Sequence, residues 1–272
     1  MVKPHYNPQK RINLLLQLIR FLKAQWRSQI NMGSIGWYLG RKGLHSNLRL
    51  EMLRNLHLGE RCFLIGNGPS LKKMDLRPLA NEFTIGLNRI YLLFDEIGFN
   101  TNYLVCVNKL VVEQCAREIA NTPCVKFISW NAHTLIPFTR ETIFLRSLLH
   151  PHFSKNLPVG MWEGSTVTYV GMQVAHHLGF QQVVLIGVDH HYETKGPPNM
   201  EVISEGDDPN HFSTQYFGEG FRWQLPDFYR SEIAYRIAKL AFEQDKREIV
   251  DATVDGRLQI FRKVKYEDLI EV

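Results

Sequence analysis

A glycine-rich turn follows the first apolar run of the chain and has the residue types of a nucleotide-binding loop. Residues 62–71 read CFLIGNGPSL, which places Gly66, Asn67, Gly68 and Ser70 directly after that run. Glycines after a strand allow a sharp turn and a close approach of the backbone to a phosphate or a ribose. The third glycine of the dinucleotide fingerprint is absent, and no Gly-Lys-Ser/Thr follows as in a P-loop. The alternative is a tight strand–helix turn that binds no ligand.

Two further apolar runs end in asparagine. Asn88 closes the segment FTIGLN, and Asn108 closes the segment YLVCVN. In an open parallel sheet the ligand crevice lies beyond the carboxyl ends of the strands, so Asn67, Asn88 and Asn108 are expected to converge on one rim. An asparagine amide both donates and accepts hydrogen bonds, which suits ribose hydroxyls and base edges. The alternative for each asparagine is a simple turn residue.

A helix start and a further strand end add candidates to the same rim. Gly164, Ser165 and Thr166 stand at the start of the helical pattern TVTYVGMQVAHHLG. They either cap this helix or, together with its N-terminus, hold a phosphate group. The run QVVLIGVD ends in Asp189, whose carboxylate suits a ribose, a metal ion or a backbone turn.

A long irregular segment, residues 190–226, carries a histidine among aromatic side chains. Its 37 residues exceed an ordinary connection, and long loops in compact enzymes are commonly lids or binding loops. His211 is the candidate general base, since closure of such a loop would exclude water from a transfer reaction. Four residues of metal-ligating type match no known metal-binding spacing: His190, His191, Asp207 and Asp208.

These candidates need a scaffold that brings distant segments together. Short apolar runs alternate with helical patterns, which is typical of βαβ units. The expected strands are Cys62–Ile65, Phe83–Leu87, Tyr103–Val107, Val125–Trp130, Val183–Val188 and Glu248–Ala252. The expected helices are Asn108–Asn121, Ser165–Leu178 and Asp227–Asp245. The sequence therefore predicts an α/β fold, a Rossmann-like, open and mostly parallel sheet flanked by helices, with a lid-like loop and an N-terminal amphipathic helix.

Composition and charge agree with this scaffold. The chain has 272 residues, 44% of them hydrophobic and 22% charged, which excludes disordered, collagenous and disulfide-scaffold proteins. Residues 1–50 carry nine Lys/Arg and no Asp/Glu, whereas the remainder carries 23 basic and 27 acidic residues. This asymmetry excludes a uniformly basic nucleic-acid binder. We expect a basic N-terminal helical segment, residues 1–57, and a nucleotide-binding transferase domain, residues 58–272, with its lid at 190–226.

The segment of residues 10–30 reads KRINLLLQLIRFLKAQWRSQI, with apolar residues at helical spacing and basic residues between them. One interpretation is an amphipathic helix on an anionic membrane surface. The other is a helix packed on the main domain or on a second subunit. The four cysteines have spacings of 44, 9 and 9 residues, which match no zinc or redox motif, and we expect buried, reduced thiols.

The order of these motifs resembles a known group of enzymes. IGNGPSL, the two strand-end asparagines, Gly-Ser-Thr-Val before a helix, and LGF-x-x-VVLIGVD-x-x-Y together resemble the MptE-like superfamily. That superfamily includes 6-hydroxymethylpterin diphosphokinases and motility-associated flagellin glycosyltransferases. The same skeleton is similar to that of small bacterial sialyltransferases that use CMP-sialic acid. The resemblance covers roughly residues 58–255, and Gly-Asn-Gly-Pro-Ser is its most specific part.

The resemblance to the sialyltransferases implies roles for individual residues. The glycine turn and the asparagines would contact CMP, as would Gly164, Ser165 and Thr166. His211 would be the general base that deprotonates the acceptor hydroxyl, without a metal ion or another cofactor. His191 stands where the family has a tyrosine, and the departing phosphate would be stabilised by His191, Tyr192 or Tyr216.

The resemblance thus predicts a cytoplasmic glycosyltransferase with a CMP-sugar donor and a glycan or glycolipid acceptor, in peripheral contact with the inner membrane face. The first alternative is a pterin diphosphokinase, which uses ATP and Mg²⁺ held by carboxylates such as Asp189, Asp207 and Asp208. The second is a nucleotide-binding protein without catalysis. Donor sugar, acceptor, linkage and homo-oligomeric state stay open at this point.

Overall fold

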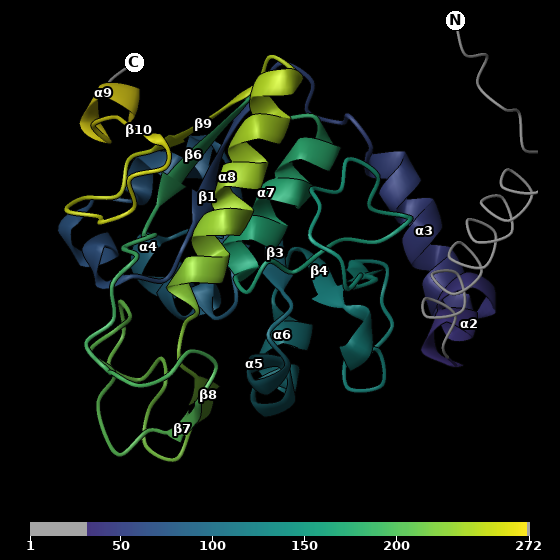
Figure 1. The fold of residues 1–272 in the computed structure, drawn as a ribbon, viewed down its shortest axis with the longest axis horizontal. Coiled ribbons are helices and arrows are strands. Elements are labelled where there is room, and N and C mark those ends of the chain that lie inside the picture. The colour runs from purple at the N-terminus through teal and green to yellow at the C-terminus, as the bar shows by residue number, and fades with distance from the viewer. Residues whose placement is uncertain (1–31, 271–272) are drawn as a thin grey trace, which may run out of the picture. The chain divides into compact units, whose positions relative to one another are not determined.

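The computed structural model of the protein describes residues 32–270 (Figure 1). The chain divides into two compact units, residues 1–44 and residues 45–272. Helix α2 (Met32–Leu39) lies in the first unit, and α3 (Arg41–Leu53) runs across the boundary. The amphipathic helix expected over residues 10–30 lies outside the described residues. Among the described helices, none is both long enough and apolar enough to span a bilayer.

The second unit is built on one eight-stranded sheet in which every neighbouring pair of strands is parallel. The strand order is β10-β9-β6-β1-β2-β3-β4-β5. The strands are β1 (Arg61–Ile65), β2 (Phe83–Leu87), β3 (Tyr103–Cys106), β4 (Val125–Ser129), β5 (Thr142–Leu145), β6 (Gln182–Ile186), β9 (Glu248–Asp251) and β10 (Arg262–Lys263). The predicted α/β, Rossmann-like fold class is therefore confirmed. Strands β5 and β10 were not anticipated.

The strand order reverses at β1, and this reversal fixes where a ligand can bind. From β1 the chain adds β2, β3, β4 and β5 on one side, and it then returns to place β6 on the other side. Leu64 of β1 is paired with Ile85 of β2 and with Leu185 of β6. Open α/β sheets bind ligands at such a switch point, beyond the carboxyl ends of the strands.

Helix α7 (Val167–Leu178) packs against the centre of the sheet, and α8 (Phe228–Gln244) lies beside α7 (Figure 1). Nearly every residue of α7 is buried because the sheet and α8 cover different faces of it. Gly171 permits this close packing, since a Cβ there would lie 2.6 Å from Cδ1 of Leu64. The packing holds the N-terminus of α7 at the carboxyl edge of the sheet.

The remaining elements connect and cover the strands. The helix expected over Asn108–Asn121 is interrupted at Cys115, which has non-helical backbone angles, giving α5 (Lys109–Gln114) and α6 (Ala116–Asn121). The glycine turn leads into a short 3-10 helix and not into an α-helix. That 3-10 helix is Pro69–Lys73, and further 3-10 segments are Arg77–Asn81, Ile90–Leu93 and Trp130–Ala132. Two short α-helices are α4 (Phe94–Ile97) and α9 (Glu267–Ile270). All four cysteines are buried and free, as expected.

The segment 190–226 contains one small hairpin, in which β7 (Glu201–Ile203) pairs antiparallel with β8 (Arg222–Gln224). Figure 1 shows this green segment extending beyond one end of the strands. The amide of Phe212 donates to the carbonyl of Asn67 at 2.9 Å, which ties the segment to the glycine turn. Arg89 ties it to the end of β2, since its guanidinium donates to the carbonyls of Gln215 and Tyr216. We refer to residues 190–226 as the lid.

Candidate active site

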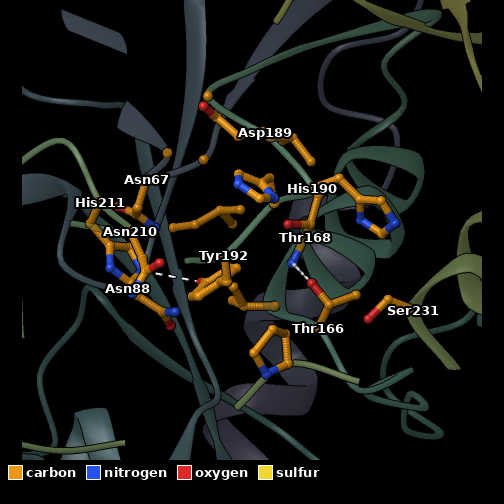
Figure 2. A pocket seen from close by; sticks show the side chains of 18 of the residues that line it. Asn67, Asn88, Thr166, Thr168, Asp189, His190, Tyr192, Asn210, His211 and Ser231 are labelled. Carbon is orange, nitrogen blue, oxygen red and sulfur yellow. Dashed lines mark hydrogen bonds between the residues drawn. The ribbon is translucent and has the colours of Figure 1, made fainter. Parts of the chain in front are cut away.

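A polar cavity of about 190 Å³ lies at the switch point, between the carboxyl ends of the strands and the lid (Figure 2). The ends of β1, β2 and β6, the N-terminus of α7 and the start of α8 contribute to its wall. Most residues that the sequence singles out line this cavity: Gly66, Asn67, Gly68, Asn88, Asn108, Ser165, Thr166, Asp189, His190, His191, Tyr192, His211 and Tyr216. Ser70 is bonded to Asp189 behind it, and Gly164 lines a neighbouring cavity.

The lid histidine is the centre of a chain of three side chains. His211 Nδ1 lies 2.6 Å from Oδ2 of Asp208, and His211 Nε2 lies 3.2 Å from the hydroxyl of Tyr192 (Figure 2). Because a carboxylate only accepts, Nδ1 carries the proton and Nε2 is left as the acceptor for the tyrosine hydroxyl. This is the tautomer that a general base needs, with Nε2 as the nitrogen that can take a proton.

Packing fixes the imidazole ring as well as its tautomer. The side chains of His211 and Asp208 are only 6% and 2% exposed. Asp208 also accepts from the amides of Asn210 at 2.8 Å and Phe217 at 3.1 Å. The ring of Tyr216 stacks on His211 with its centroid 4.0 Å away and an interplanar angle of 11°. The lid therefore presents the histidine in a single orientation.

Two asparagines bring unsatisfied oxygens to the cavity. Asn67 is 9% exposed, and its Oδ1 has no hydrogen-bond partner among the described residues; the same is true of the buried Oδ1 of Asn88. Figure 2 shows both side chains on the same side of the cavity as His211. A buried polar atom without a partner costs about 1–3 kcal/mol. Ligand hydroxyl or amino groups bonded to these two oxygens would remove that cost.

Asn108 and Thr166 have structural partners in addition to their place in the wall. Asn108 Oδ1 accepts from the amide of Val111 at 3.1 Å and caps α5. Thr166 Oγ1 accepts from the amide of Thr168 at 3.3 Å and caps α7. The preceding Ser165 has a φ of 62°, so the backbone turns sharply into the helix. Of the cap candidates Gly164, Ser165 and Thr166, only Thr166 is the N-cap of α7 among the described residues, and the N-terminus of α7 still borders the cavity.

The glycine turn packs tightly against the end of β6. The amide of Gly66 donates to Ile186 at 2.8 Å, and that of Gly68 donates to Gly187 at 2.9 Å. A Cβ on Gly68 would lie 1.8 Å from Oδ2 of Asp189, so a larger residue would displace that carboxylate. This close approach explains the glycines without any ligand. It agrees with the alternative interpretation, a tight turn that binds no ligand.

Asp189 fastens this turn from the other strand. Its carboxylate accepts from the amide of Ser70 at 3.0 Å and from the Ser70 hydroxyl at 2.6 Å. Burial raises the pKa of Asp189, and the two bonds from Ser70 offset part of that rise. Of the three roles considered for Asp189, the structure therefore displays that of a turn-holding residue, on the cavity wall.

The residues after Asp189 differ from one another in burial. His190 has a φ of 54°, and its Nε2 lies 3.2 Å from Oε1 of Glu232. His191 is exposed at the edge of the cavity. Burial raises the pKa of both Tyr192 and Tyr216, so their hydroxyls keep their protons and can donate hydrogen bonds near neutral pH.

The three carboxylates considered as metal ligands lie in different surroundings. Asp189 is bonded to Ser70, Asp208 to His211, and Asp207 is exposed. Within residues 32–270, no group of three or more His, Cys, Asp or Glu side chains is placed to hold a metal ion.

Sequence reasoning did not identify two important contacts. Asp208 was considered only as a metal ligand, although its spacing of three residues before His211 was a signal for a local Asp–His pair. Arg89, directly after Asn88, was not considered at all, and it binds the lid. A lone arginine after a strand carries no pattern that could have revealed this contact.

No protein-family model and no curated protein sequence matches the chain. Two solved structures have a similar backbone. The MAf glycosyltransferase from Magnetospirillum magneticum AMB-1 shares 14% identity at a TM-score of 0.49, over 83% of this chain and 39% of that one. The sialyltransferase CstII from Campylobacter jejuni, solved with cytidine-5′-monophosphate, shares 11% identity at a TM-score of 0.36, over 76% of this chain and 86% of that one. This likeness is one of fold, and the chain spans well under half of the length of the first protein.

Proposed function

We propose that the protein is a nucleotide-sugar-dependent glycosyltransferase with a CMP-sugar donor and a glycan or glycolipid acceptor. The observation that supports it most strongly is the buried pair of Asp208 and His211, in which the imidazole lines a polar cavity at the switch point. The motif resemblance to the CMP-dependent sialyltransferases supports the choice of donor. The open oxygens of Asn67 and Asn88 supply acceptors for hydroxyl groups of the donor.

The reaction is a displacement at the anomeric carbon of the donor sugar. His211 Nε2 takes the proton of the acceptor hydroxyl while that oxygen forms its bond to the anomeric carbon. The bond from this carbon to the phosphate oxygen breaks, and CMP leaves with the bonding electrons. Asp208 stabilises the imidazolium that forms, because its carboxylate is already bonded to Nδ1.

Tyr192 marks the place that the acceptor hydroxyl would take. Its hydroxyl lies 3.2 Å from Nε2, which is where the proton to be removed must be. As the acceptor enters, the Tyr192 side chain would move aside, and its hydroxyl could then donate to the departing phosphate. Tyr216, also protonated, and His191 at the edge of the cavity are the other donors proposed for this phosphate, beside the N-terminus of α7.

The two alternatives make different demands on the same residues. A pterin diphosphokinase needs carboxylates that hold Mg²⁺, but Asp189 and Asp208 are engaged with Ser70 and His211. A nucleotide-binding protein without catalysis has no need for an oriented, buried base. The arrangement therefore favours glycosyl transfer, and we propose that it proceeds without a metal ion or another cofactor.

The first test is a thermal-shift comparison of CMP, CDP, UDP, GDP and ATP, each with and without Mg²⁺. A ligand at a hundred times its dissociation constant adds about 2.7 kcal/mol to stability, and we expect this effect from CMP without metal. Stabilisation by ATP only in the presence of Mg²⁺ would contradict the proposal and favour the diphosphokinase.

The second test concerns turnover. With CMP-sialic acid as the probe donor, release of CMP is followed in the wild type and in His211→Ala. We expect the variant to lose about 10²–10⁴-fold in rate while its affinity for CMP is unchanged. Equal rates in the two proteins would refute the role of His211 as the base.

A further inference from the structure

A second cavity of about 570 Å³ opens beside the first, over the carboxyl ends of β3 and β4 and the segment after β5. Its lining is partly polar and partly apolar and includes Asn131, Ser129, Ser147, Trp162 and Glu163. None of these five residues was predicted from the sequence to have a role. Its volume is within the range of about 300–1,000 Å³ typical of small-molecule sites, whereas the first cavity is below that range.

The two cavities share one wall, and the N-terminus of α7 is part of it. Both are lined by Asn88, Asn108, Ser165, Thr166, Val167 and Gln224. A nucleotide sugar carries its phosphate between the sugar and the nucleoside, and a helix N-terminus favours a phosphate. With the phosphate at the shared wall, the reacting sugar carbon lies in the cavity of His211. The ribose and the base then extend into the second cavity.

Glu163 is the notable polar group of the second cavity. Its Oε1 accepts a hydrogen bond from the hydroxyl of Ser147. Burial raises the pKa of Glu163, and the bond from Ser147 offsets part of that rise. The other charged groups that line the cavity are Arg230 and the ion pair of Lys109 with Glu113, whose atoms are 3.6 Å apart.

The surroundings of this carboxyl are incomplete without a ligand. Its partner among the described residues is a neutral hydroxyl, which occupies one of its two oxygens. Glu163 is half-buried, and a base that enters the cavity would remove Oε2 from water, which is costly unless a donor replaces that water. An N–H group of a ligand bonded to the second oxygen, Oε2, would offset this cost. The site therefore selects for a ligand that presents a hydrogen-bond donor there.

Pyrimidine bases differ in the group that they present at position 4. Cytosine has an amino group, which only donates, and carboxylates of proteins recognise this group. Uracil has a carbonyl oxygen at the same position, which only accepts and would face the carboxyl oxygen of Glu163. A site built to accept a hydrogen bond rejects an analogue that lacks the donor.

We infer that Glu163, positioned by Ser147, accepts a hydrogen bond from the 4-amino group of cytosine and thereby selects cytidine over uridine nucleotides. The second cavity is then the base subsite of the donor. This inference rests on the proposed function, since it assumes that a nucleotide sugar is the donor. Glu163 acts on binding, at the far end of the donor from the reacting carbon.

The test compares dissociation constants of CMP and UMP, measured by calorimetry. We expect the wild type to prefer CMP by about 10- to 100-fold, the value of one hydrogen bond to a charged group. In Glu163→Gln the amide can turn either its oxygen to cytosine or its nitrogen to uracil, so the preference falls to within about threefold. Glu118→Gln is the control, because Glu118 is an exposed carboxylate of α6 that lines neither cavity, and it keeps the wild-type preference.

A second measurement needs no variant of Glu163. The monophosphate of pyrimidin-2-one riboside has the shape of CMP without the 4-amino group, and we expect it to bind the wild-type protein as weakly as UMP does. Ser147→Ala is expected to reduce the preference for CMP in part. If this analogue binds as tightly as CMP, or if Glu163→Gln keeps the full preference, the role of Glu163 is overturned while the proposed function stands. If the wild type binds no CMP at all, the proposed donor fails.

Discussion

Nδ1 of His211 lies 2.6 Å from Oδ2 of Asp208, and both side chains are almost fully buried. The same carboxylate accepts from the amides of Asn210 and Phe217, so it holds the lid backbone and the imidazole together. The pair therefore links the conformation of a long loop to the protonation pattern of one ring. Asp208 acts through His211 and is a positioning residue.

Asp208→Asn should separate catalysis from binding. The asparagine amide can donate to Nδ1 of His211, which moves the proton of the ring to Nε2 and removes the base. We expect kcat to fall by about 10²-fold or more, with KM for the donor and affinity for CMP within about threefold of the wild type. Steady-state kinetics and calorimetry with CMP give these values.

Asp207→Asn is the control, because Asp207 is the exposed neighbour of Asp208. It removes one negative charge from the same part of the lid and should leave kcat unchanged. A large loss of kcat in Asp207→Asn, or none in Asp208→Asn, would contradict the role of the buried pair.

Gly68→Ala tests the packing of the glycine turn. The added Cβ would lie 1.8 Å from Asp189 Oδ2, so Asp189 and its bonds to Ser70 must move. We expect a loss of about 3 kcal/mol in the free energy of unfolding, measured with urea. Gly206→Ala is the matched control in the lid, where a Cβ meets nothing within 4 Å, and it should change stability by less than about 1 kcal/mol. Equal effects of the two substitutions would show that the close approach to Asp189 is unimportant.

Arg89→Ala tests how the lid is held. The guanidinium of Arg89 bonds to the carbonyls of Gln215 and Tyr216 and lies 5.2 Å from the ring centroid of Phe221. Without it we expect the lid to open more often, giving faster proteolysis within residues 190–226 and a donor KM about tenfold higher. Arg262→Ala, at the β9–β10 edge where Arg262 pairs with Glu248, should change neither quantity. If Arg89→Ala also changes neither, the lid is held by other contacts.

The core strands could be predicted because each is a continuous apolar run between turn residues. β5, with the sequence TIFL, is short, and β10 is an exposed two-residue strand, so neither has a pattern distinct from a loop. The break of the helix at Cys115 has no proline or glycine to mark it. Tertiary contacts decide these cases, and local sequence does not contain them.

The rim of the site could be predicted from topology alone. Asn67, Asn88 and His191 line one cavity because the parallel strands that precede them end on one edge of the sheet. The sequence reveals which residues follow each strand. The side-chain partners could not be predicted in the same way. The bonds from Ser70 to Asp189 and from Ser147 to Glu163 join residues far apart in the chain, and only the folded structure brings them together.

His176 gives a prediction about the dependence of stability on pH. Burial lowers the pKa of His176 to about 4, although its Nε2 lies 2.7 Å from Oδ2 of Asp245, which acts in the opposite direction. The unfolded chain therefore binds a proton near pH 6.5, where the folded protein does not. Stability from this group is complete above pH 6.5 and is lost as the pH falls towards 4. The shift corresponds to roughly 3 kcal/mol.

His176→Gln keeps a donor for Asp245 and removes the titration. We expect the difference in unfolding free energy between wild type and variant to change by roughly 3 kcal/mol between pH 7 and pH 4, with the variant gaining relative to the wild type at low pH. Urea unfolding at several pH values measures this difference. His150→Gln, at an exposed position, should leave the wild-type dependence intact. If the wild type and His176→Gln lose stability in parallel on acidification, the buried histidine does not titrate as its surroundings indicate, and buried carboxyl groups must account for the loss.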